Sequence, residues 1–168
     1  MKWYQFVLAG LIGAVALAGI GFLVSRGSAA RLEGHITNIR TLGMDENSSV
    51  AIVDFEAMNP SQILLIVGDR NIVVTDEQGI VRESSTISAV DLKSLFQYFP
   101  ALGSLDNEPL TMRVRVEPGT ILRGVVAARF EIPKHALDAR RDLVLQVKDA
   151  DGGVSELRAN QGASPALK

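Results

Sequence analysis

The chain has 168 residues, a formal net charge of −2 and no cysteine. This length suits one domain with short appendages. Because cysteine is absent, disulfide bonds, thiolate metal sites and thiol catalysis are excluded. All 19 acidic residues follow residue 30. Of the 17 basic residues, only Lys2 and Arg26 precede it, so the chain after residue 30 has a net charge near −4. Nucleic-acid binding needs a basic surface, so we expect no nucleic-acid partner.

The N-terminal region is dominated by an apolar segment. Residues 6–24 are 19 consecutive residues without a charged or strongly polar side chain. As a helix this segment is roughly 28 Å long, close to the hydrocarbon thickness of about 30 Å. Trp3 and Tyr4 before it and Arg26 after it are typical of membrane interfaces. The pattern predicts that residues 1–30 are a single-pass transmembrane anchor, in contact with the lipid bilayer through residues 6–24.

Cleavage of this segment as a signal peptide is the alternative. Residues 28–30 are small enough for a cleavage site, but the apolar region of a signal peptide usually spans about 7–15 residues. The basic residues on its two sides are nearly balanced, so they give little information on orientation. Short N-terminal anchors ahead of a single domain commonly export it. We therefore expect the folded domain on the extracytoplasmic side of the membrane.

After residue 31 the apolar pattern changes to a period of two, which is typical of strands with one buried face. Residues 111–117 and 121–132 alternate most regularly and predict two strands joined by a turn at Pro118–Gly119. Further strands are expected near residues 35–42, 51–57, 62–67, 71–75, 79–84, 142–148 and 153–158. Turns are expected at Asn59–Pro60, Gly68–Asp69, Asp76–Gly79 and Asp151–Gly153. About eight short strands at this spacing predict an antiparallel β-sandwich over residues 31–158, and residues 159–168 read as a frayed tail.

One helix interrupts the strands, over residues 88–100. Ser88 is placed to cap its first turn, with Asp91 three residues later, and Pro100 ends it. One face carries Leu92, Leu95, Phe96 and Phe99 at helical spacing. We expect this face to cover an open end of the sandwich, and a ligand pocket is the alternative.

The order of the segments also resembles a known family. A strand ending in FEAMNPSQ, a PG turn, a strand ending in FEIP and a late strand DLVLQVKD follow the anchor. Over roughly residues 33–158 this resembles the small immunoglobulin-like sandwiches of envelope proteins, and Asn59–Pro60 is similar to the late-embryogenesis-abundant type 2 (water-stress) sandwiches. The helix at 88–100 departs from both patterns. The resemblance implies an antiparallel immunoglobulin-like β-sandwich with one inserted helix, preceded by a transmembrane helix, in a binding, structural or assembly role without catalytic residues.

A stripe of arginines is the candidate binding site. Pairing the apolar faces across Pro118–Gly119 places Glu117 opposite Ile121 and Arg115 opposite Arg123. Like charges opposite one another destabilise a sheet, so the stripe is expected to receive a phosphate, a lipid headgroup or an acidic partner. The alternative is that acids such as Glu56 neutralise it as a solvated face. The predicted stripe consists of Arg113, Arg115, Arg123 and Arg129.

No enzymatic or metal chemistry is predicted. Residues 149–156 partly match a calcium loop, but the flanking strands call for a hairpin turn there. His35 and His135 have no acid and hydroxyl at a recognised spacing, and no phosphate-binding glycine loop precedes a helix. We therefore predict no cofactor, no metal and a membrane-tethered, non-enzymatic domain that binds a protein or envelope component. A structural or stress-protective domain is the alternative, and a small hydrolase with a non-obvious site is less favoured.

Overall fold

The computed structural model describes residues 30–159 of the chain, which form a mainly β fold with two short α-helices in that range. The strands are β1 (Glu33–Gly43), β2 (Ser49–Met58), β3 (Leu65–Thr75), β4 (Val81–Arg82), β5 (Ser85–Thr86), β6 (Arg115–Val116), β7 (Ile121–Phe130), β8 (Asp142–Asp149) and β9 (Val154–Ala159). The helical elements are α2 (Ala89–Tyr98), the 3-10 turn η1 (Pro100–Leu102) and α3 (Lys134–Asp138).

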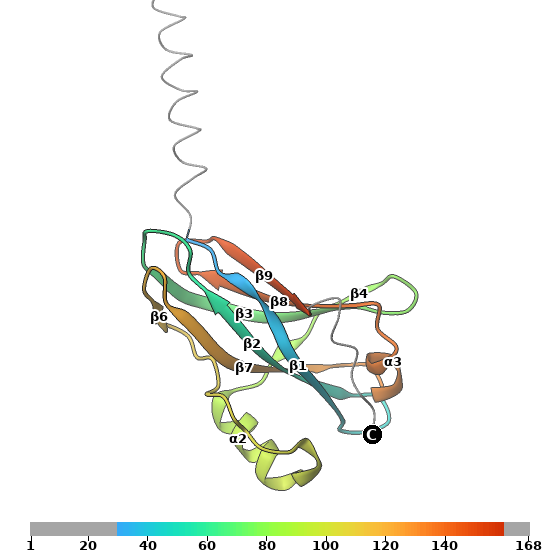
Figure 1. Cartoon of the computed structure of the whole chain (residues 1–168). Coiled ribbons are helices and arrows are strands. Elements are labelled where there is room, and N and C mark those ends of the chain that lie inside the picture. Colours follow the sequence, from blue (N-terminus) through green and yellow to red (C-terminus); the bar gives the residue numbers. More distant parts are fainter. Residues whose placement is uncertain (1–29, 160–168) are drawn as a thin grey trace, which may run out of the picture.

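The strands form one curled, mixed sheet in the order β4-β3-β8-β9-β1-β2-β7-β5 (Figure 1). The prediction was an antiparallel sandwich of two sheets. The difference arises at β9, which turns back from β8 and then runs parallel to β1, with His35 opposite Arg158. This parallel pair joins the last strand to the first, so the two halves become one continuous sheet.

The long strands nearest the two ends of the curled sheet, β3 and β7, are linked to each other twice. At one end of the curled sheet β6 pairs with β3, and the chain then turns directly into β7. At the other end β5 pairs with β7, while the hydroxyls of Ser84 and Thr86 donate hydrogen bonds to the β3 carbonyls of Ile72 (2.7 Å) and Arg70 (2.8 Å). The edges of β3 and β7 are therefore largely covered, which limits edge-to-edge association.

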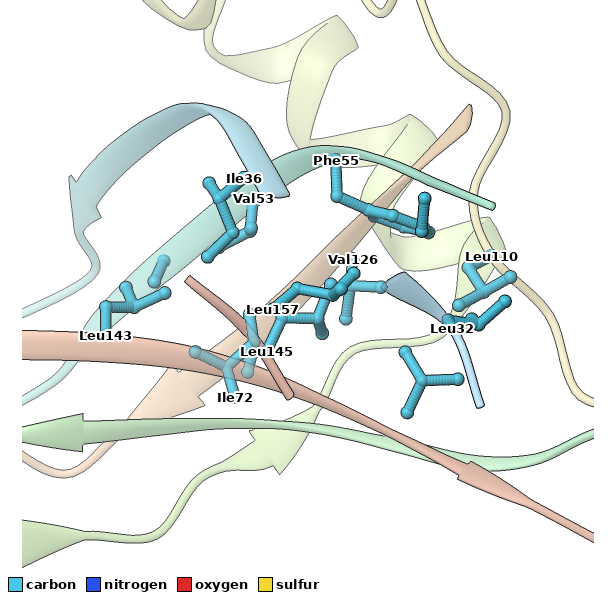
Figure 2. Packing of buried hydrophobic residues seen from close by; sticks show 14 of the residues in the cluster. Leu32, Ile36, Val53, Phe55, Ile72, Leu110, Val126, Leu143, Leu145 and Leu157 are labelled. Atoms are coloured by element: carbon cyan, nitrogen blue, oxygen red, sulfur yellow. The ribbon is translucent and has the colours of Figure 1, made fainter. Parts of the chain in front are cut away.

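The main hydrophobic core fills the inside of this curl, because alternate residues of each strand point inward. Figure 2 shows how Ile36, Val53 and Phe55 from β1 and β2 lie close to Leu145 and Leu157 from β8 and β9. The two halves of the sheet therefore share one interior. The expected inward face of residues 51–57 is confirmed, since Ala51, Val53, Phe55 and Ala57 all belong to this core. The opposite face was expected to be exposed, but Ile52 and Asp54 are buried there as well.

Two sequence predictions were wrong, one about the end of a strand and one about the partner of a strand. Residues 65–75 form the single strand β3, and the expected turn at Gly68–Asp69 is a register shift within it, a β-bulge between Val67 and Asp69. Residues 111–117 were expected to pair with the following strand. Instead Arg113 has a left-handed backbone (φ 65°), and only Arg115–Val116 form a strand, which pairs with β3.

The turn predictions at the other positions are confirmed where hydrogen bonds define them. At Pro118–Gly119 the N–H of Thr120 donates to the carbonyl of Glu117 (3.1 Å), and Gly119 has the positive φ of 70° that such a turn needs. Asp76–Gly79 also closes a hydrogen-bonded turn. The turn expected at Asp151–Gly153 begins two residues earlier, because the N–H of Gly152 donates to the carbonyl of Asp149 (2.9 Å).

Helix α2 begins as predicted, because the hydroxyl of Ser88 accepts a hydrogen bond from the N–H of Asp91 (3.1 Å). Its apolar face covers the outer face of β2 and β7, and not an open end of a sandwich. This contact forms a second hydrophobic cluster, which contains Val50, Ile52, Leu92, Leu102, Val125 and Ala127. Helix α3 was not predicted, and it inserts the fully buried Leu137 into the main core.

The predicted membrane anchor within residues 1–30 and the predicted tail lie almost wholly outside the described residues. Within residues 30–159, no helix has the length and apolar character needed to span a bilayer.

Candidate functional site

A groove of about 550 Å³ opens beside helix α2, on the outer face of the sheet. Its walls are α2, the segment around β5 and the turn between β1 and β2. The side chains around it are Met44, Val50, Ser85, Thr86, Ile87, Ser88, Asp91, Ser94, Leu95, Tyr98, Phe99 and Arg129. Most of the contact surface is apolar, so the groove is suited to apolar side chains of a ligand.

The apolar part of the groove comes from both layers of the fold. Val50 is a buried residue of β2, whereas Leu95 and Phe99 pack over the outer cluster from α2 and its C-cap. Met44 is 45% exposed and Tyr98 is 78% exposed, so both project at its rim. Exposed large apolar side chains beside an apolar groove are typical of interaction sites.

The polar rim is built around Arg129, at the end of β7. Its guanidinium donates to the hydroxyl of Ser48 (3.2 Å) and lies 3.8 Å from the carboxylate of Asp45. The hydroxyl of Ser48 also donates to Asp45, and this hydrogen bond is the largest cause of the lowered pKa of Asp45. Because the Arg129 and Asp45 side chains are both 56% exposed, their pair is weak, and a ligand carboxylate can replace Asp45 beside Arg129.

A partly buried ion pair joins Arg40 of β1 to Asp54 of β2, beneath α2 and the chain that follows it. The guanidinium of Arg40 also donates to the carbonyls of Leu102 (3.1 Å) and Ser104 (2.9 Å), and it lies 4.8 Å from the centre of the Phe96 ring. Arg40 therefore contacts both the sheet and the chain after α2. This arrangement keeps the helical wall of the groove in place.

The structure does not bring the four predicted arginines together. Arg123 lies opposite Glu56 and pairs with it at 2.6 Å, which is the largest cause of the lowered pKa of Glu56. Arg115 lies opposite Ile66 and not opposite Arg123, because β6 pairs with β3. Along β7 the apolar residues under α2 separate Arg123 from Arg129. Arg129 lies at the groove, and Arg113 and Arg115 lie near the opposite end of the sheet.

Two of the acids in the segment considered for calcium binding, Asp149 and Glu156, have structural partners. Asp149 is buried, and its carboxylate accepts hydrogen bonds from the N–H groups of Ile66 and Ala150, both at 2.9 Å. Glu156 accepts from Gln146 and Arg158 on the surface. Among the described residues, no group of three or more histidines and acids is arranged to hold a metal ion. His135 is exposed on α3, and His35 lies half-buried in β1.

Of the groove residues, the sequence predicted a binding role only for Arg129. Ser88, Asp91, Leu95 and Phe99 were named for the cap and the apolar face of the helix, where a ligand pocket was the alternative. Sequence reasoning missed Met44, because this residue belongs to a turn whose position relative to α2 depends on the whole sheet. Tyr98 carried a usable signal. It is a large aromatic residue of the helix outside the predicted apolar face, and such a residue is expected to be exposed.

Comparison of the chain with models of known protein families, with curated proteins and with solved structures finds no match.

Proposed function

We propose that this chain is a single-pass, membrane-tethered binding domain on the extracytoplasmic side, and that it acts without catalysis. The groove beside α2 binds an apolar, acid-containing segment of a protein partner. The observation that carries this proposal is the groove itself, with its apolar lining and the guanidinium of Arg129 at one side. The resemblance to envelope immunoglobulin-like sandwiches belongs to the same proposal and agrees with a role in a larger membrane assembly.

The size and chemistry of the groove favour a peptide segment as its occupant. A volume of about 550 Å³ accommodates a few large side chains and not a whole folded element. Hydroxyl groups of Ser85, Ser88 and Ser94 lie along a lining that is otherwise mainly apolar. A peptide presents polar backbone groups between its side chains, so it complements this mixture better than an acyl chain does. An acidic side chain of the peptide then pairs with Arg129 in place of Asp45.

The tether is inferred from residues 6–24, an apolar segment long enough to cross a bilayer. Anchoring restricts the domain to the membrane surface, where a membrane-bound partner has a high effective concentration. A groove of modest size is therefore sufficient for binding that would be weak in solution.

The test uses the full chain, purified from solubilised membranes with its bound proteins. We expect a stoichiometric partner to be recovered with the unsubstituted chain and lost with the double variant Met44→Asp/Tyr98→Asp, because two carboxylates then flank an apolar site. Arg129→Glu should weaken the same complex. The matched control is Val81→Asp, since Val81 is 61% exposed in β4 and outside the groove lining.

Circular dichroism verifies that the variants remain folded. Recovery of the partner with the groove blocked would contradict the proposed site, and so would the absence of any stoichiometric partner. Protease accessibility in intact cells, with N-terminal sequencing of the mature chain, tests the orientation and the uncleaved anchor.

A further inference from the structure

One end of the sheet, called here the β1 end, collects segments that are distant in the sequence. β1 begins there, and the antiparallel register places the end of β2 and the start of β7 beside it, since Glu33 lies opposite Met58 and Met58 opposite Ile121. The start of β3, strand β6 and the β8–β9 turn lie at the same end, because Leu65 pairs with Val116 and Val67 with Asp149. Figure 1 shows these loops together at the end where β1 starts.

This end exposes a group of large apolar side chains. They are between 39% and 59% exposed, and they come from four separate segments of the chain. The group consists of Met58, Ile63, Met112, Ile121 and Val154. Scattered exposed apolar residues need no explanation, but several at one end of a small domain indicate a surface that contacts something apolar.

The chain leading into the domain enters at this same end and is held there. Ala30 is 1% exposed and Leu32 is 4% exposed, so both belong to the main core. The N–H of Leu32 donates to the hydroxyl of Ser155 (2.8 Å), which fixes the start of β1 to β9. The chain is therefore packed into the domain from residue 30 onwards, and no unpacked linker lies between residue 30 and β1.

The distance from the predicted membrane segment is short. Five residues, 25–29, separate Val24 from Ala30. Even a fully extended chain advances at most about 3.6 Å per residue, so these six steps reach about 22 Å. If residues 6–24 cross the bilayer, the β1 end must lie within that distance of the membrane surface. No other end of the domain contains residue 30.

We infer that the β1 end rests on the bilayer from which the chain emerges, with its exposed apolar side chains in the lipid headgroup region. This inference rests on the membrane tether proposed above. Exposed Arg31, Arg113 and Arg115 at or near this end are available to lipid phosphates. Exposed Glu33, Glu117 and Asp151 offset their charge, so the apolar side chains are the main contribution and anionic lipid is not required.

This orientation also gives separate roles to the arginines of the predicted stripe. Arg113 and Arg115 face the membrane, whereas Arg129 lies at the groove on the far part of β7. A domain held against the bilayer at its β1 end presents the groove beside α2 away from the lipid, where a protein partner has access to it.

The absence of cysteine allows single-cysteine labelling of the full chain reconstituted in vesicles. Variants Ile63→Cys and Ile121→Cys place a fluorophore at the β1 end, at side chains that are 45% and 53% exposed. Val81→Cys is the control at the opposite end of β3, where the side chain is 61% exposed. The vesicles contain a lipid with a nitroxide quencher at the headgroup. We expect loss of fluorescence at positions 63 and 121 and retention at position 81, in zwitterionic as well as anionic vesicles.

Three results would overturn the inference, and they differ in what they mean for the tether. Equal quenching at all three positions, in chain that floats with the vesicles and resists alkaline extraction, refutes the membrane contact and leaves the tether intact. Quenching only in anionic vesicles refutes an apolar contact. Chain that fails to float with the vesicles refutes the tether, and the membrane contact with it.

Discussion

Arg40 and Asp54 form an ion pair on the outer face of the sheet, with side chains that are only 18% and 6% exposed. They lie on neighbouring strands, since Asp54 is opposite Asn38, two positions before Arg40. Asp54 also accepts a hydrogen bond from the side chain of Asn107 (3.1 Å). The pair therefore joins β1, β2 and the chain after α2, and the position of the groove wall depends on it.

Replacing Arg40 by methionine leaves the carboxylate of Asp54 buried without its charged partner. We expect Arg40→Met to lower the free energy of unfolding by about 3–5 kcal/mol, measured by urea unfolding followed by circular dichroism. The control is Arg123→Met, whose pair with Glu56 is largely exposed (64% and 35%) and should change stability by about 0–1 kcal/mol. The double variant Arg40→Met/Asp54→Leu should recover part of the loss. Equal effects of the two single variants would contradict this account.

Asn59 holds the β2–β3 loop against the strand β6. Its side chain is fully buried and donates to the carbonyls of Ile63 (2.8 Å) and Val116 (2.9 Å). Asn59→Ala leaves both carbonyls without this donor, so the free energy of unfolding should fall by about 2–3 kcal/mol. Denaturant unfolding measures the change, with the exposed Asn47→Ala as control. A change no larger than that of the control would show that the loop finds other donors.

Gly34 allows β1 and β2 to approach closely. A Cβ at this position would lie 2.1 Å from the carbonyl oxygen of Glu56 and 2.5 Å from the Cα of Ala57. Because both are backbone atoms, Gly34→Ala should separate the strands and cost about 3 kcal/mol or more. At Gly43 the nearest atom is a Lys134 side-chain carbon at 3.4 Å, so Gly43→Ala should be tolerated. Thermal unfolding compares the two, and similar midpoints would refute the predicted clash.

Asp76 makes stability depend on pH in the acid range. Burial alone would raise its pKa, but the N–H of Ile80 (2.8 Å) and the guanidinium of Arg82 (2.8 Å) hold the pKa below the ordinary 3.8. The folded state thus binds the proton less readily than the unfolded chain. The stabilisation is fully present above about pH 5 and is lost as the pH falls through the folded-state pKa.

Asp76→Asn should therefore reduce the loss of stability on acidification, measured as the thermal midpoint between about pH 6 and pH 3. Part of the dependence should remain, because hydrogen bonds and basic neighbours also lower the pKa values of Asp45, Glu56 and Asp138. Glu77→Gln, at an exposed position of the same turn, is the control. An unchanged pH profile in Asp76→Asn would exclude this carboxylate as a source.

Local signals in the sequence were sufficient for most single elements. The alternation in residues 51–57 predicted β2, and Ser88 with Asp91 predicted the start of α2. Predictions failed where the outcome depends on a distant partner. Gly68–Asp69 has the composition of a turn, but β8 continues alongside it, and the extra residue is absorbed as a bulge. No local pattern predicts that Arg115 lies opposite Ile66, because β6 pairs with β3, a strand that is distant in the sequence.

In the candidate site, too, local features were predictable from the sequence and contacts between distant segments were not. Arg129 was identified because charge on a predicted strand is visible in the sequence. The groove itself needs Met44, Ile87 and Tyr98 to come together, and their proximity depends on the packing of α2 across β2 and β7. Sequence periodicity predicts which face of a helix is buried but not which sheet surface it covers.

The parallel pairing of β1 with β9 has a consequence for biosynthesis. Ile36 lies opposite Ala159, and β9 also supplies the partner for β8. A chain released or stalled before residue 154 would leave open one edge each of β1 and β8, and such edges recruit other strands. Completion of this sheet is therefore a late event, because it waits for β9, the last strand of the described residues, to be synthesised. The risk of edge-to-edge association is therefore greatest before β9 has paired with β1 and β8.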